Sequence, residues 1–269
     1  MQTTDNAQAS RRRPGQWPEV REIALADLLE VLAAGLLDFR AAPLYGLGLA
    51  GIYAVGGWLL VLLLVAFDLP YLVYPLAIGF ALIAPFVATG FYAVSRCLET
   101  GDPPSAQAIV RAVRAAFAGD LGWMALVTGF SLFIWVDVAA MLFFGFFGLR
   151  SFEIAELLAL VFTTPMGLLF MLIGNTAGAV IALAVFSFSV VSFPMLFDRR
   201  VDFVTAMVTS VRLVRRNPRA MFVWCAIIAA LIGLSLLSGL LALFAVLPLL
   251  GHASWHLYRR AVGPARVSA

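Results

Sequence analysis

Two histidines have a spacing that can bind a metal ion. His252 and His256 are four residues apart, so they share one face if the segment is helical. Paired imidazoles in this register occur in metal and haem sites. However, no third ligand lies nearby, and the run between them lacks the glutamate of a zinc-protease helix. Because Trp255 and Tyr258 are typical of a membrane interface, we expect hydrogen-bonded histidines and keep a metal site as the weaker alternative.

A single carboxylate lies inside a long apolar stretch. Asp137 is near the middle of residues 121–147, and a carboxylate in hydrocarbon costs roughly 2.5–3.5 kcal/mol on insertion scales. We therefore expect Asp137 to face other helices, to be protonated or to meet a polar side chain. With Asn175 it makes a candidate intramembrane polar site, which either responds to protons or cations or has only a structural role. Other polar residues available to it are Thr128, Ser131, Ser187 and Ser189.

Charged residues gather where apolar stretches end. Asp198, Arg199, Arg200 and Asp202 form a dense charged turn, and Arg96 ends an earlier apolar stretch. Such residues usually form ion-paired, solvated ends of membrane helices. The alternative is a docking surface for a protein partner or for lipid phosphate.

Other patterns that carry chemistry are missing from the sequence. We find no nucleophile elbow, P-loop, dinucleotide fingerprint or DNA-binding pattern. Cys97 and Cys225 form no CxxC pair or Cys/His cluster, and we expect free thiols. We therefore expect a protein that is not an enzyme, with no cofactor and no nucleic-acid partner.

The composition indicates a protein of the lipid bilayer. Hydrophobic residues make up 63% of the 269 residues and charged residues only 12%, whereas soluble domains are roughly a quarter charged. We predict an all-α, polytopic membrane helical bundle. The bilayer core requires roughly 20 apolar residues per crossing. On this basis about six spans are expected, at residues 45–67, 71–96, 121–147, 165–197, 220–237 and 239–256.

The span at residues 71–96 is unusual because it contains Pro75 and Pro85. Prolines are tolerated in membrane helices, where neighbouring helices can satisfy the freed carbonyl groups. The stretch is either an ordinary lipid-facing span or a kinked helix that borders a cavity.

Residues 151–197 can be divided in two ways. They hold either two spans that meet near Gly174 and Asn175, or a short surface helix at 153–163 and one long span. All 18 basic residues are arginines, and the single-span arrangement leaves only Arg150 on the outer side. We therefore prefer one span, with both termini in the cytoplasm of a bacterium whose inner membrane holds the protein.

An amphipathic segment precedes each pair of spans. Asp38, Asp120 and Asn217 mark the point where each amphipathic segment gives way to the apolar residues. This pattern predicts a threefold repeat of an interfacial helix followed by a helical hairpin. The three interfacial helices are expected at residues 23–38, 104–118 and 201–215, and the repeats at about 23–97, 104–197 and 201–260. We expect residues 1–22 to be a disordered basic arm, 23–261 a single transmembrane domain and 262–269 a flexible tail.

Three stretches resemble a bacterial family of predicted integral membrane proteins, the domain of unknown function numbered 2189. They are YPLAIGFALIAPFVATGFYAVSR (74–96), SFPMLFDRRVDFVTAMVTSVRLVRRNP (192–218) and LPLLGHASWHLYRR (247–260). The resemblance implies about six spans in a bacterial inner membrane, and it implies no particular activity.

These observations favour a non-enzymatic scaffold or an accessory subunit of a membrane complex, because close-packing faces and charged turns outnumber groups that could do chemistry. One alternative is a small-solute or ion transporter that uses the intramembrane acidic site. A second is a haem- or metal-associated redox accessory protein that uses the two histidines.

Overall fold

The computed structural model describes residues 18–66, 73–149 and 152–263. Helices dominate these residues, and their only β-structure is an isolated bridge between Val20 and Val262. The all-α bundle is therefore confirmed. The helices are α1 (Leu25–Ala41), α2 (Pro43–Ala66), α3 (Val73–Thr100), α4 (Ala106–Phe117), α5 (Asp120–Phe147), α6 (Ile154–Thr163), α7 (Pro165–Ser189), α8 (Ser192–Asp198), α9 (Phe203–Arg216), α10 (Pro218–Leu237) and α11 (Leu243–Ala261).

Short polar residues and prolines set several helix starts. Ser105 accepts a hydrogen bond from the Ala108 amide at the start of α4, and Asp202 does the same for the Thr205 amide at the start of α9. Thr164 caps α7, whose first residue is a proline. These contacts satisfy amide groups that would otherwise lack partners at a helix N-terminus. They fix the residue at which α4, α7 and α9 each begin.

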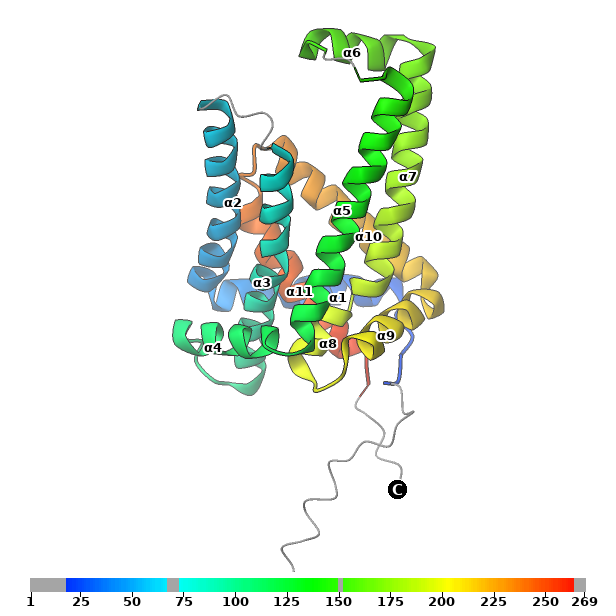
Figure 1. The fold of residues 1–269 in the computed structure, drawn as a ribbon. Helices are drawn as coiled ribbons and strands as arrows, with labels where there is room; N and C mark the ends of the chain where they lie inside the picture. The colour runs from blue at the N-terminus through cyan, green and yellow to red at the C-terminus, as the bar shows by residue number, and fades with distance from the viewer. Residues whose placement is uncertain (1–17, 67–72, 150–151, 264–269) are drawn as a thin grey trace, which may run out of the picture.

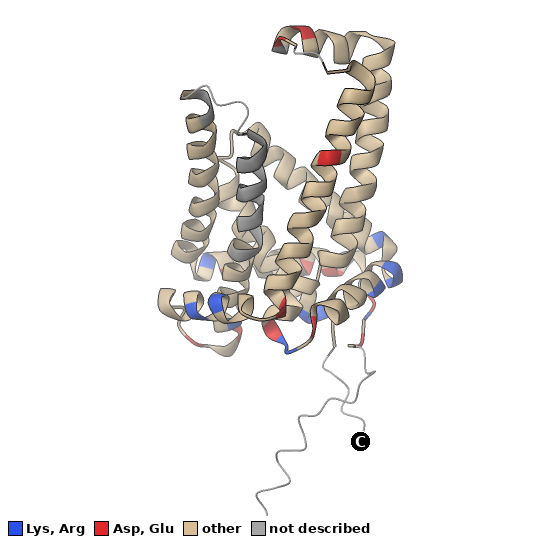
Figure 2. Cartoon of the chain, in the orientation of Figure 1, with Lys and Arg blue, Asp and Glu red and all other residues tan. Residues whose placement is uncertain are grey.

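Long helices run roughly alongside one another, and shorter ones lie across their ends (Figure 1). α5 and α7 form a pair that extends beyond α2 and α3, and α6 lies across the top of that pair. α4 and α9 lie across the opposite end. Arginines gather at this lower end, whereas the upper end of α5, α6 and α7 shows only acidic colouring (Figure 2).

Four helices are long and apolar enough to cross a membrane: Pro43–Leu63, Asp120–Phe147, Pro165–Asp198 and Pro218–Leu237. They correspond to four of the six expected spans, so the count of six is not confirmed. The expected span at 71–96 includes residues 71 and 72, which lie outside the described part of the chain, and α3 covers the rest. The expected span at 239–256 begins later, because residues 239–242 form a turn in which Gly239 and Leu240 have positive φ.

Residues 151–197 contain one long span rather than two. α7 continues without a break through Gly174 and Asn175, where a two-span arrangement would have placed a turn. The described part of the preceding surface helix, α6, ends at Thr163, as predicted. After a short turn at Val190 and Val191, α8 extends the same segment to Asp198.

The last helix, α11, forms the centre of the packed end of the molecule. It contacts α1, α2, α3, α8 and α10. Its buried residues lie on more than one face, and they include Trp255, Leu257 and Tyr258, which have no exposed surface. A helix buried in this way does not need an uninterrupted apolar sequence, because its neighbours rather than lipid surround it. This explains how one helix carries two histidines and two arginines.

The three interfacial helices are used in the same way. Each packs against the second long helix of the preceding predicted repeat, and the first repeat follows the third. Thus α4 packs on α3, α9 on α7 and α1 on α11. Polar contacts follow the same order. Tyr45 donates to the Pro104 carbonyl before α4 (2.8 Å), Asp120 accepts from the Phe203 amide of α9 (3.3 Å), and Asn217 accepts from the Ile23 amide before α1 (2.8 Å). The units are thus linked in a ring.

The two ends of the packed region pair with each other beyond the boundaries predicted from the sequence. Arg21 donates its backbone amide to the Ala261 carbonyl (2.9 Å), and the Gly263 amide donates to the Glu19 carbonyl (3.0 Å). Val20 and Val262 are 5% and 2% exposed. Residues 18–22 therefore do not belong to the arm predicted over residues 1–22. Residues 262 and 263 likewise belong to the packed region, which the sequence placed at 23–261.

Candidate functional site

A polar cluster connects α1, α3 and α11. Ser95 and Nδ1 of His252 are 2.7 Å apart, and both side chains are buried. One turn later on α11, Nε2 of His256 lies 2.8 Å from Oδ2 of Asp38. The histidine pair thus shares a helix face, as its spacing predicted, but each ring is held by a different helix.

Asp38 is the charged member of this cluster. Burial alone would raise the pKa of its carboxyl, but hydrogen bonds with His256 and Ser95 outweigh burial, so the pKa of Asp38 lies below its ordinary value. Asp38 is therefore ionised at neutral pH. Ser95 interacts with both Asp38 and His252, so a continuous chain of polar contacts joins the two histidines.

Glycines allow the helices of this cluster to approach closely. A Cβ atom on Gly35 of α1 would lie 2.7 Å from the Ala253 amide nitrogen, and one on Gly251 would meet the ring of Phe91 of α3. That ring lies edge-on to His252, with 5.3 Å between the ring centres. Among the buried side-chain atoms that the structure describes, Nε2 of His252 lacks a hydrogen-bond partner.

The described residues contain no group of three or more His, Cys, Asp or Glu side chains placed to hold a metal. Ser95 already engages Nδ1 of His252, and Asp38 engages Nε2 of His256. Each imidazole thus has one ring nitrogen engaged by a neighbouring helix, while Nε2 of His252 has no partner among the described atoms. The geometry of the cluster is that of an interhelical link.

A second, more highly charged cluster surrounds the end of α11. Arg259 is 3.0 Å from Oε1 of Glu99 on α3 and 3.4 Å from Oδ2 of Asp198 on α8. The indole of Trp255 donates to Glu99 (3.2 Å), and the hydroxyl of Tyr258 donates to Asp198 (2.6 Å). We call these five residues the α11 collar. They join three helices that are distant in the sequence.

Arginines outside the collar extend the same connections. Arg260 pairs with Asp27 (2.7 Å) and with Glu30 on α1. Arg199 donates to the carbonyl oxygens of Gly263 (2.8 Å) and Val262 (3.1 Å). Arg96 lies over the ring of Phe197, 4.2 Å from its centre. Most of the charged groups at this end thus take part in contacts between elements.

The predicted inner charged surface is therefore divided. Asp198 bonds to α11, Arg199 bonds to the residues just after α11, and Arg96 packs on α8. Asp202 instead caps α9, and its hydrogen bonds with Thr205 hold the pKa of its carboxyl below the ordinary range. Arg200 is exposed, and its side chain forms no hydrogen bond or ion pair with the residues that the structure describes.

Asp137 and Asn175 lie on two helices that pack together, α5 and α7. Trp135 touches Gly178, where an added Cβ would lie 2.7 Å from the indole. Asp137 is two positions from Trp135, and Asn175 is three positions from Gly178. Asp137 and Asn175 therefore lie at a similar height along the paired helices. Both side chains are exposed, however, and the Asn175 amide donates to the Met171 carbonyl of its own helix (2.7 Å). Asp137 therefore does not face the packed interior of this chain, because α5 packs only part of its surface; that it is protonated or meets a polar side chain stays a prediction.

Other hydroxyl groups proposed as partners for Asp137 bond within their own helices. Thr128, Ser131 and Ser187 each donate to the carbonyl four residues earlier. The residue that sequence reasoning missed is Ser95. Ser95 is a single hydroxyl in an apolar helix and carries no signal of its own. Glu99 was visible only as part of a charged helix end.

Comparison with known proteins supports insertion into a membrane, and it identifies no particular activity. No curated protein and no solved structure matches the chain. The model of a family described as predicted integral membrane protein, domain of unknown function 2189, matches residues 73–198, which run from the start of α3 to the end of α8. This match agrees with the four apolar helices of membrane-spanning length. The chain is thus an integral membrane protein that is similar to this family over the segment from α3 to α8.

Proposed function

We propose that the protein is a non-enzymatic scaffold or accessory subunit of a membrane complex. The observation that carries this proposal is the use made of the polar side chains around α11. Asp38, Ser95 and both histidines bond to one another across three helices, and the collar joins α3, α8 and α11. Groups used in this way hold elements together rather than face a substrate.

The long helices on the other side of the molecule offer surface for a partner. Only 6% of the most apolar stretch of α5 is buried, compared with 39% for the segment that contains α7 and α8. Large apolar side chains such as Phe130 and Met141 are exposed along α5. A partner helix would pack on this face by van der Waals contact, as membrane helices do.

We assign the protein to a bacterial inner membrane with the α4 and α9 end in the cytoplasm. Arginines of α4, α9 and α11 gather at this end (Figure 2). The positive-inside rule places such residues on the cytoplasmic side. Reporter fusions within the loop at residues 101–105 and after residue 263 test this: activity of a periplasmic reporter at either position would reverse the orientation.

Site-specific crosslinking in intact membranes tests the scaffold proposal. A photoreactive residue in place of Met141 on α5 is expected to give one crosslinked species of constant mass. The control is the same residue in place of Leu62 on α2, whose side chain is exposed to a similar extent. Identification of the same protein from independent preparations would support the proposal. A pattern of lipid adducts alone at position 141 would contradict it.

A transporter that uses Asp137 is the second candidate, favoured by a carboxylate and an amide at similar depth on adjacent helices α5 and α7. Proton or cation flux into proteoliposomes would then fall in Asp137→Asn and persist in Asp102→Asn, a change in the loop before α4. Equal flux in protein-containing and empty vesicles would remove this candidate.

A further inference from the structure

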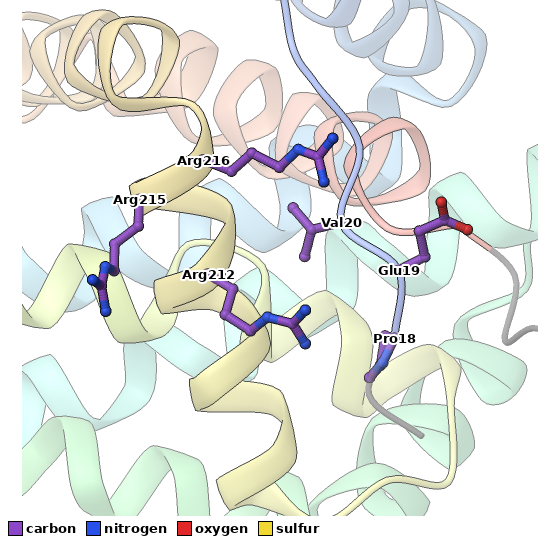
Figure 3. Close-up of a pocket in the computed structure, with 6 residues that line it drawn as sticks. All are labelled: Pro18, Glu19, Val20, Arg212, Arg215 and Arg216. Carbon is purple, nitrogen blue, oxygen red and sulfur yellow. The ribbon is translucent and has the colours of Figure 1, made fainter. Parts of the chain in front are cut away.

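A basic pocket lies between α9 and the residues that lead into α1. Its volume is about 360 Å³, and it is lined by Pro18, Glu19, Val20, Arg212, Arg215 and Arg216. Figure 3 shows Arg212 and Arg216 extending from successive turns of α9 toward the segment of Pro18 to Val20, while Arg215 projects to the side. This pocket is separate from the polar cluster and from the collar.

Hydrogen bonds to the residues around the end of α11 and to Asn217 hold the pocket's far wall in place. Hydrogen bonds from Arg21 and Gly263 tie this segment to the end of α11, and Asn217 fixes the next residues by accepting from the Ile23 amide and donating to the Arg21 carbonyl (3.0 Å). The wall is thus attached at both edges. A pocket with a fixed wall needs little reorganisation to accept a ligand.

Positive charge exceeds negative charge around the pocket. Arg216 pairs with Glu22 at 3.2 Å, and Glu19 is the acidic residue in the lining. Arg212 and Arg215 have no hydrogen-bond or ion-pair partner among the residues that the structure describes. The three guanidinium groups of α9 carry three positive charges, and the carboxylates of Glu19 and Glu22 carry two negative charges. One positive charge is therefore not balanced. A ligand with a single negative charge would balance it.

The position of α9 indicates where this ligand comes from. α9 packs across the ends of α5 and α7, where Phe203 stacks on Trp123 with ring centres 6.5 Å apart. Trp123 is exposed, and tryptophan is typical of the level of the lipid headgroups. Val204 of α9 is also exposed. Arginines on an interfacial helix at this level can reach headgroup phosphates.

We propose that this pocket binds a phosphodiester anion, the headgroup phosphate of an anionic phospholipid. Guanidinium groups suit this ligand, because their planar donors match phosphate oxygens in pairs. Val20 and Pro18 supply an apolar edge for the glycerol part of the headgroup. The proposal is independent of the scaffold function, since it concerns a different surface.

Native mass spectrometry of the full chain released from nanodiscs tests the proposal. Wild-type protein from discs that contain phosphatidylglycerol and phosphatidylcholine should retain phosphatidylglycerol. Arg212→Gln/Arg215→Gln should bind it about 30-fold more weakly, which corresponds to about 2 kcal/mol at about 1 kcal/mol for each arginine. Arg216 is left unchanged, because its loss would also break the ion pair with Glu22.

The control is Arg111→Gln/Arg114→Gln on α4. These two arginines have the same spacing on the equivalent interfacial helix, they are also exposed, and they do not line the pocket. Retention lost only in the α9 variant supports a pocket. Equal losses in both variants would mean general attraction between arginines and lipid, and would overturn the proposal.

A second arm separates lipid from free phosphate. The unfolding temperature in neutral detergent is measured with inorganic phosphate and, separately, with a short-chain phosphatidylglycerol. Stabilisation by the lipid that disappears in the α9 variant and returns in Arg212→Lys/Arg215→Lys supports the proposal. Stabilisation by inorganic phosphate alone, or by neither compound, would overturn the assignment to a lipid headgroup.

Discussion

The two ends of the molecule are held together by different kinds of contact. At the end where the arginines gather, which we call the inner end after the orientation proposed above, α1, α3, α8 and α11 are joined by hydrogen bonds, ion pairs and close glycine contacts. At the opposite, outer end, α5, α7 and Phe152 before α6 meet through phenylalanines, and the ring centres of Phe147 and Phe170 are 4.9 Å apart. Polar contacts are directional and aromatic contacts less so. The inner end therefore fixes one arrangement, and the outer end tolerates adjustment.

The largest difference in stability between the two ends should come from adding a single methyl group at Gly35. In Gly35→Ala the new Cβ would meet backbone atoms of α11, namely the Ala253 nitrogen at 2.7 Å and the Leu249 oxygen at 2.9 Å. Because backbone cannot rotate away, we expect a loss of about 3 kcal/mol in the free energy of unfolding. Unfolding by SDS in mixed micelles measures it.

The control for this variant is Gly174→Ala on α7. A Cβ there meets nothing within 4 Å, and alanine favours a helix by about 1 kcal/mol over glycine. It should be neutral or stabilising. Equal losses in the free energy of unfolding at Gly35 and Gly174 would show that the helices are not packed more closely at one end than at the other.

Removal of a carboxylate from the collar should have the next largest effect. Asp198→Ala takes away the acceptor for the Tyr258 hydroxyl and a partner of Arg259. Hydrogen bonds to charged groups contribute about 1.5–3 kcal/mol, so we expect a loss of about 2 kcal/mol in the same unfolding measurement. Glu156→Ala on exposed α6 should change stability by no more than about 0.5 kcal/mol. A cost at Glu156 as large as at Asp198 would contradict the comparison.

Acid should weaken the inner end through Asp38. Since its pKa in the folded protein lies below the ordinary value, ionised Asp38 stabilises the fold at pH above about 4, and this stabilisation is lost as the pH falls through the folded pKa. Stability measured by thermal unfolding should thus fall more steeply below about pH 4 in wild type than in Asp38→Asn. Parallel pH profiles for the two proteins would show that Asp38 does not contribute.

The smallest effect should come from the aromatic contacts of the outer end. Phe143 touches Phe147, Phe152 and Phe170, but its side chain is only half-buried. Phe143→Leu keeps most of the apolar volume, so we expect a loss of about 1 kcal/mol or less in SDS unfolding. A loss greater than that of Asp198→Ala would show that the contacts of the outer end contribute more to stability than those of the inner end.

Local signals in the sequence predicted much of the fold. Ser105, Asp202 and Thr164 are of types common at helix N-termini; they were not predicted as caps, but the structure uses each as one. The distribution of arginines correctly favoured one span over residues 165–197. Both kinds of signal act within a few residues or through the bilayer, so no knowledge of distant contacts was needed.

Contacts between distant segments could not be predicted in the same way. Ser95 and His252 are separated by 157 positions, and nothing near either residue identifies the other. The pairing of residues 19–21 with 261–263 was likewise missed, since a polar chain end looks the same whether it is free or packed. Asp38 was recognised as a marker of the repeat, but its histidine partner lies 218 positions away.

The central place of α11 has a consequence for biogenesis. The ribosome makes this helix after α1 to α10, yet α1, α2 and α3 all rest on it. Until it inserts, Gly35 faces no backbone and Glu99 has neither Trp255 nor Arg259 beside it. The contacts that fix α1, α2 and α3 around α11 can therefore form only after residues up to 261 have been synthesised.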